Sequence, residues 1–94
     1  MDEKVIYTTI ARIDTTSAPQ VQKEIQELLD QGVLELVIDM EKTTYISSVG
    51  LRILLTTQKY MNAHKGTLVL RHVREQVKEI FDVTGFSGFL SLED

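Results

Sequence analysis

The sequence predicts one small α/β domain over residues 1–94, in which a mostly parallel or mixed sheet packs against alternating helices. Apolar segments rich in β-branched residues alternate with segments whose apolar residues recur at helical spacing, as in βαβ units. The chain has 94 residues, the length of one domain. Its composition, 43% hydrophobic and 26% charged, is ordinary for a globular protein and argues against disorder.

The first predicted strand spans Val5 to Ile13, which is rich in β-branched residues and long enough to bend or to form two short strands. The polar residues 15–17 interrupt it. A helix is expected next, because Val21, Ile25, Leu28 and Leu29 form one apolar stripe. Its start, Ser17-Ala18-Pro19-Gln20, has the spacing of a capping box, and Gly32 is a natural residue to end it.

The second half of the chain repeats the alternation. Residues Val33 to Met40 are almost continuously apolar, which suits a central strand covered on both faces. A loop from Glu41 to Ile46 leads to Ser47-Ser48-Val49-Gly50, after which helical spacing continues toward Gly66. A strand from Thr67 to Val73 and a last helix from Arg74 to Thr84 follow. The apolar residues of the tail are expected to pack back onto the core: Phe86, Phe89, Leu90 and Leu92.

Charge and composition exclude several classes of function. The net charge of −4 disfavours nucleic-acid binding and direct binding to anionic membranes. The absence of Cys excludes disulfides, thiolate zinc sites and a Cys nucleophile. The acidic start of the chain does not resemble a signal peptide, and no apolar run approaches the roughly 20 residues of a membrane helix. We therefore expect a cytoplasmic protein.

Catalytic signatures are also missing. His64 and His72 lie far apart in sequence, and the chain has no nucleophile elbow, dinucleotide-binding fingerprint or Walker motif. Asp39, at the end of an apolar strand, is interpreted as a loop-facing residue or, alternatively, as a metal ligand or phosphoacceptor. A receiver-like domain phosphorylated on Asp39 would need a nearby acidic pair for Mg²⁺ and a later Lys. Asp14 is a single acid with no evident paired partner, so this alternative ranks last. We expect no enzyme activity, no cofactor and no metal.

The segment Tyr45-Ile46-Ser47-Ser48-Val49-Gly50-Leu51 is the most informative place in the chain. It delivers two serines to the start of a helix, where Ser47 or Ser48 would serve as the N-cap. The same position tolerates a phosphate, because free N–H groups and the helix dipole favour negative charge there. A phosphoserine carries about −1.5 to −2 charges and would repel or obstruct a docked partner without unfolding the helix. One serine could serve both purposes.

Three motifs carry a resemblance to a known family. Residues Val37 to Leu55 are close to the pattern L-D-L-S-x-V-x-x-[IM]-D-S-S/A-G-L-x-x-L-L. Residues Ala11 to Ala18 match G-x-[LI]-D-x-x-T/S-A, and Glu79 to Phe86 look like a final helix with its T-G-[LF] turn. In order and spacing, they resemble the STAS domain family, and within it the bacterial anti-sigma factor antagonists.

The resemblance implies a partner-switching cycle. The serine two residues before the Gly-Leu pair, here Ser48, would be phosphorylated by an anti-sigma factor that is also a serine kinase of the histidine-kinase-like ATPase fold. The unphosphorylated protein would bind that kinase and release a sigma factor, and a metal-dependent serine phosphatase would restore it. The implied partner-binding surface comprises Asp14, Thr15, Thr16, Tyr45, Ile46, Ser47, Ser48, Val49, Gly50, Leu51 and Arg52.

The chain departs from the family pattern in three places. Ser47 replaces the aspartate before the phosphoserine, which makes Ser47 an alternative acceptor. Ala11 replaces a glycine, and few residues precede it, so the first family strand is either abbreviated or the sheet edge differs. The alternative function is a STAS scaffold subunit without phosphorylation, in a membrane transport complex or another signalling assembly.

Overall fold

The computed structural model describes residues 4–93, which form three helices and six strands. The strands are β1 (Lys4–Thr8), β2 (Arg12–Ile13), β3 (Glu35–Asp39), β4 (Tyr45–Ile46), β5 (Thr67–Arg71) and β6 (Leu92–Glu93). The helices are α1 (Ala18–Asp30), α2 (Ser48–Ala63) and α3 (Glu75–Thr84). None of the helices in this part of the chain is long and apolar enough to cross a bilayer.

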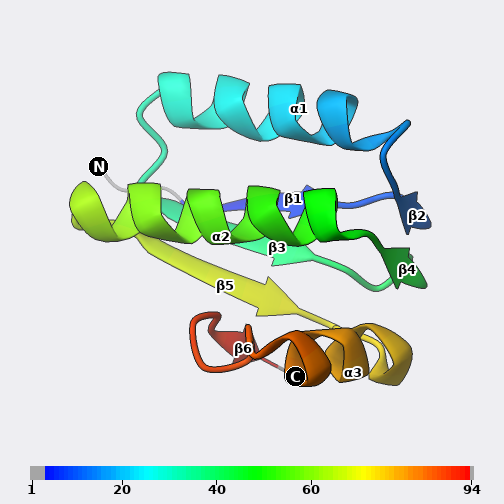
Figure 1. Ribbon diagram of the computed structural model, residues 1–94. Helices are drawn as coiled ribbons and strands as arrows, with labels where there is room; N and C mark the ends of the chain where they lie inside the picture. The colour runs from blue at the N-terminus through cyan, green and yellow to red at the C-terminus, as the bar shows by residue number, and fades with distance from the viewer. Residues whose placement is uncertain (1–3, 94) are drawn as a thin grey trace.

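The main sheet has the order β1-β3-β5-β6, and all of its strand pairs are parallel. Strands β2 and β4 form a separate parallel ribbon beyond the carboxyl ends of β1 and β3. Figure 1 shows α1 and α2 side by side against the sheet, with α3 beside the end of β5. The predicted α/β domain with a mostly parallel sheet is confirmed.

The core lies between the sheet and the first two helices. Leu36 and Ile38 of β3 and Leu68 and Leu70 of β5 are buried at alternate positions, as a period of two requires. They pack against buried side chains of the helices, among them Val21, Ile25, Leu51 and Leu54. Val37, on the other face of β3, is buried too, but Glu35 and Asp39 on that face are only half-buried, so β3 is central and covered more fully on the helix side.

The segment Val5 to Ile13 forms two strands rather than one bent strand. The break is held by Thr9, whose buried hydroxyl lies 2.5 Å from the hydroxyl of Thr43. The Thr43 hydroxyl also donates to the carbonyl of Ile10 (2.6 Å). These contacts fasten the β3–β4 loop to the chain between β1 and β2, and so determine where β4 and α2 begin.

The predicted capping box at Ser17 is wrong. Ser17 has helical backbone angles (φ −90°, ψ −20°), so its side chain does not reach the N–H groups of the first turn. Its hydroxyl instead donates to the carbonyl of Arg12 (2.7 Å). Asp14 supplies the local turn, because its carboxylate accepts hydrogen bonds from the N–H groups of Thr16 and Ser17, both at 3.0 Å.

The tail follows the prediction only in part. Phe86 packs partly buried against the core and Leu90 is buried. Phe89 is 65% exposed, and its N–H donates to the carbonyl of Phe86 in a turn. Leu92 is also exposed, since it belongs to the short edge strand β6, which the sequence did not predict.

Candidate partner-binding site

The β2–β4 ribbon brings the Asp14 turn beside the Tyr45–Ser48 segment. Arg12 pairs with Tyr45 and Ile13 with Ile46, and the N–H of Ser47 donates to the carbonyl of Ile13 (2.7 Å). Two of the sequence motifs that carry the family resemblance therefore meet at one end of the sheet. They lie at the end of the molecule where β4 leads into the first turn of α2 (Figure 1).

Ser47, and not Ser48, is the N-cap of α2. Its backbone is extended (φ −85°, ψ 172°), and its hydroxyl accepts a hydrogen bond from the N–H of Gly50 (3.3 Å). Ser48 is the first residue of the helix and is exposed. Within residues 4–93 its hydroxyl makes no hydrogen bond. The two adjacent serines thus have separate structural positions.

Three members of the implied surface are buried. Ile46 and Leu51 are each 2% exposed, and Gly50 is buried as well. A Cβ at Gly50 would lie 2.6 Å from the Cγ1 atom of Ile46 and 2.7 Å from the Cγ2 atom of Ile13. These residues cannot contact a partner directly. Their part in the site is to seat the first turn of α2 against the β2–β4 ribbon.

The remaining members reach the surface. Thr15, Thr16, Tyr45, Ser48 and Arg52 are exposed. Asp14, Ser47 and Val49 are half-buried. The outer surface of the site therefore combines hydroxyls, one aromatic ring, one carboxylate and one guanidinium, which suits a polar protein interface.

The Asp14 carboxylate is held in its ionised form. Hydrogen bonding from the Ser17 N–H is the main cause that lowers the pKa of Asp14 below its ordinary value, and the Thr16 N–H adds to it. Arg12 contributes as well, with its Nε atom 3.8 Å from the Asp14 carboxylate. A negative charge thus lies at the end of β2, whose last residue, Ile13, accepts a hydrogen bond from the Ser47 N–H.

Arg12 is a site residue that the sequence analysis missed. Its guanidinium lies over the ring of Tyr45, 4.5 Å from the ring centroid, while 63% of the side chain stays exposed. Arginine and tyrosine are among the residue types most enriched at energetically important interface positions. The pairing of β2 with β4, which places the two side chains together, could not be recognised from the sequence because each strand has only two residues.

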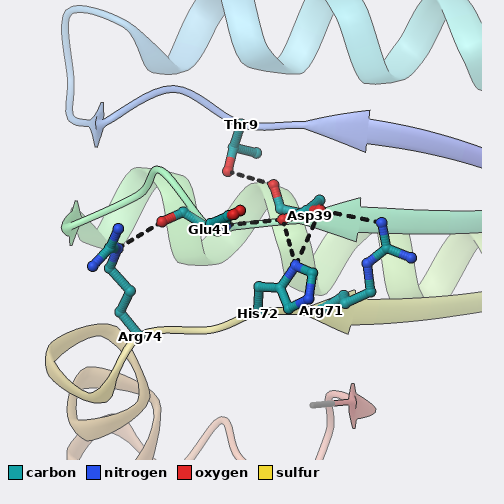
Figure 2. A network of polar contacts seen from close by, with 6 residues as sticks. All are labelled: Thr9, Asp39, Glu41, Arg71, His72 and Arg74. Carbon is teal, nitrogen blue, oxygen red and sulfur yellow. Dashed lines mark hydrogen bonds and ion pairs between the residues drawn. The ribbon is translucent and has the colours of Figure 1, made fainter.

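A second polar network lies at the carboxyl ends of β3 and β5 (Figure 2). The Asp39 carboxylate accepts hydrogen bonds from the Glu41 N–H (3.0 Å) and from Arg71 Nη2 (3.2 Å), and His72 Nδ1 lies 3.2 Å away. Burial raises the pKa of Asp39, but these hydrogen bonds outweigh it, so the net pKa is lowered. Arg74 Nε extends the network by donating to the Glu41 carbonyl (2.6 Å).

This network fits the loop-facing interpretation of Asp39. Its carboxylate is occupied by basic and N–H groups, and the described residues contain no cluster of three His, Asp or Glu side chains that could hold a metal ion. The two histidines lie apart: His72 belongs to this network, and the ring of His64 stacks on that of Tyr60. The network fastens the start of the loop that leads to Tyr45.

Comparisons with known proteins agree with this geometry. The STAS domain family matches residues 2–94. The anti-sigma-B factor antagonist of Bacillus subtilis is 30% identical over 92 residues, which cover 97% of this chain and 84% of that protein. A putative anti-sigma factor antagonist of Bordetella bronchiseptica, BtrV, is 34% identical over 74 residues, or 79% of this chain. The match spans only 64% of that relative's length.

Solved structures show the same fold. The anti-sigma factor antagonist SpoIIAA in its unphosphorylated form superposes with a TM-score of 0.81 at 18% identity, over 100% of this chain and 83% of that one. The phosphorylated form of the Bacillus protein superposes with a TM-score of 0.75 at 18% identity, over 100% and 86%. At 18% identity the structural similarity shows only that the fold is shared. The family itself is shown by the match of the STAS domain model to residues 2–94. This chain belongs to the STAS domain family.

Proposed function

We propose that this protein is an anti-sigma factor antagonist, a non-catalytic binding protein that is switched off by phosphorylation of Ser48. The observation that carries the proposal is the exposed Ser48 hydroxyl at the first position of α2, left free because Ser47 caps the helix. The names of the relatives support the class of function. Ser47 is the poorer acceptor, since its half-buried hydroxyl is engaged with Gly50 N–H.

In this proposal the unphosphorylated surface around Tyr45, Ser48 and Arg52 binds an anti-sigma factor in the cytoplasm, and the sigma factor held by it is released. The anti-sigma factor is also a serine kinase of the histidine-kinase-like ATPase fold. It transfers the γ-phosphoryl group of ATP to the Ser48 oxygen, with ADP as the leaving product. A metal-dependent serine phosphatase hydrolyses the phosphoserine and restores binding.

The local electrostatics explain how a phosphate could break the complex without breaking the fold. The N-terminus of α2 favours negative charge, so about −1.5 to −2 charges at Ser48 do not destabilise the helix. Arg52 lies one turn further along α2, at the i+4 spacing that brings opposite charges together. The charges of Asp14, Arg12 and Arg52 sum to about +1 at this surface, so the added phosphate would reverse its sign toward a docked partner.

Phosphosite mapping tests the proposal. The protein is incubated with ATP and lysate of its source organism, beside S48A and S47A, and the phosphopeptides are sequenced by mass spectrometry. We expect one phosphate on Ser48, absent from S48A and retained in S47A. Phosphate on Ser47 of the wild-type protein would move the switch by one residue. Full binding of S48D to the kinase captured from that lysate would instead favour the scaffold function.

A further inference from the structure

The outer edge of β1 is a surface that the proposed switch does not use. Strand β1 ends the sheet order β1-β3-β5-β6, and within residues 4–93 it pairs only with β3. The N–H of Thr9 donates to the carbonyl of Asp39 (3.0 Å). Because backbone groups alternate in direction along a strand, those of Val5 and Tyr7 also point toward β3. The N–H and C=O groups of Lys4, Ile6 and Thr8 therefore point outward.

This edge lacks the features that usually protect edge strands from pairing. Such strands are kept short, or contain Pro, a bulge or several charged side chains. Strand β1 has five residues, no Pro and one charged residue, Lys4, at its start. Ile6 stands at its centre and is 48% exposed. The opposite edge strand, β6, has only two residues.

We propose that two copies of this chain pair through β1 in antiparallel orientation, with the two-fold axis at Ile6. In this register Ile6 lies opposite Ile6 of the second copy, and Lys4 lies opposite Thr8 of the second copy. All of these residues have outward-pointing backbone groups, so each pair exchanges two hydrogen bonds.

The side chains are self-complementary in the same register. Val5 faces Tyr7 of the second copy, an aromatic and β-branched pair, and the isoleucines pair with each other on the opposite face. No like charges stand opposite each other, because Lys4 is the only charged residue of β1. The two four-stranded sheets join into one continuous sheet, and the two-fold symmetry closes the assembly at a dimer.

The dimer is independent of the proposed phosphorylation, since no residue of β1 belongs to the surface around Ser48. Sedimentation velocity of the full chain, from micromolar to millimolar concentration, measures it directly. We expect a concentration-dependent dimer for the wild-type protein. I6K places two ammonium groups opposite each other and T8P removes an outward N–H donor, so each should raise the dissociation constant by about tenfold or more.

Matched controls make the test specific to this register. V83K changes an 86% exposed apolar residue on α3 and should leave the dimer unchanged. An equimolar mixture of I6K and I6E should recover the dimer, because opposite charges then face each other across the axis. Circular dichroism confirms folding of each variant. In hydrogen exchange, the amides of Ile6 and Thr8 should gain protection with concentration, whereas that of Tyr7 is protected throughout.

Two outcomes would overturn the proposal. A monomer at every concentration would show that the β1 edge does not pair. A dimer that survives both I6K and T8P, or that is lost in V83K, would place the interface elsewhere. A dimer lost in both β1 variants and restored by the charge-reversed mixture would establish the register.

Discussion

The hydroxyl of Ser47 accepts a hydrogen bond from the N–H of Gly50 (3.3 Å), and this contact gives two adjacent serines different roles. Ser47 satisfies a donor that the first turn of α2 would otherwise leave without a partner. Ser48 does not cap the helix and is exposed to solvent. The sequence left open which serine caps the helix, and only the backbone angles of the loop distinguish them.

The cap role predicts unequal effects on stability. S47A should lower the free energy of unfolding by about 1 kcal/mol, the usual loss for an N-cap serine. S48A removes an exposed hydroxyl and should change it by less than about 0.5 kcal/mol. Urea denaturation of the two variants beside the wild type measures both values. Equal losses would contradict the assignment of Ser47 as the cap.

Gly50 predicts a packing effect in the same turn. G50A forces a Cβ to within 3 Å of buried carbons of Ile46 and Ile13. We expect a net loss of about 1–2 kcal/mol, because overpacking outweighs the better helix propensity of alanine. G88A is the matched control, since a Cβ there meets nothing within 4 Å. A thermal midpoint of G50A at or above that of G88A would show that the side chains of Ile46 and Ile13 can shift to accommodate the added Cβ at little cost.

The assignment of the core is tested by truncation. Ile38 and Leu54 are fully buried between the sheet and the helices, as their periodicity predicted. I38A and L54A should each lower the free energy of unfolding by about 2–5 kcal/mol. V83A, at an exposed position of α3, should be close to neutral. Midpoints of I38A or L54A within error of V83A would mean that the buried faces are misassigned.

The Asp39 network predicts a dependence of stability on pH. Burial opposes the charge, but hydrogen bonds from Glu41 N–H, Arg71 and His72 hold the pKa of Asp39 below its ordinary value. A carboxyl whose folded pKa is lowered stabilises the fold above its unfolded pKa of about 4 and loses this contribution as the pH falls through the folded pKa. The stability gap between the wild type and D39N should therefore narrow on acidification.

Urea midpoints measured between neutral and acid pH check this. E27Q, which alters an exposed carboxylate of α1, serves as the control and should follow the wild type closely. A gap between wild type and D39N that stays constant over the whole range would show that the network does not depend on the ionised carboxylate.

The sequence predicted the fold well, because its periodic segments are long enough to carry a signal. Strands β1, β3 and β5 and all three helices fall where apolar periodicity placed them. The two-residue strands β4 and β6 are too short for a period of two to be recognised. The capping box predicted at Ser17 did not form although its spacing was correct. The Asp14 carboxylate accepts the hydrogen bonds of this turn instead, from the N–H groups of Thr16 and Ser17.

The candidate site was predicted as a set of neighbours in sequence, and its spatial members differ. Ile46, Gly50 and Leu51 lie within the predicted segment but are buried, because the alternation of β4 and the first turn of α2 point them inward. Arg12 was missed, because it reaches Tyr45 only through the β2–β4 pairing. Which side chains form a surface is decided by long-range pairing, which local patterns do not encode.

The stacking of Arg12 on Tyr45 predicts a role in recognition. R12A removes the guanidinium that covers the Tyr45 ring and balances the Asp14 carboxylate. If the pair is an anchor of the interface, the initial rate of Ser48 phosphorylation in lysate should fall about tenfold, which corresponds to about 1.4 kcal/mol. R12K keeps the charge without the planar stacking group and should give an intermediate rate.

K59A, which removes an exposed cation elsewhere on α2, separates recognition from net charge. Both R12A and K59A change the net charge by one unit, so a general electrostatic effect on encounter would slow them equally. A rate that falls only in R12A, with an unchanged urea midpoint, would place Arg12 in the interface. Equal phosphorylation rates for R12A and K59A would contradict a role of Arg12 in recognition. The stacking of Arg12 on Tyr45 would then only stabilise the β2–β4 ribbon.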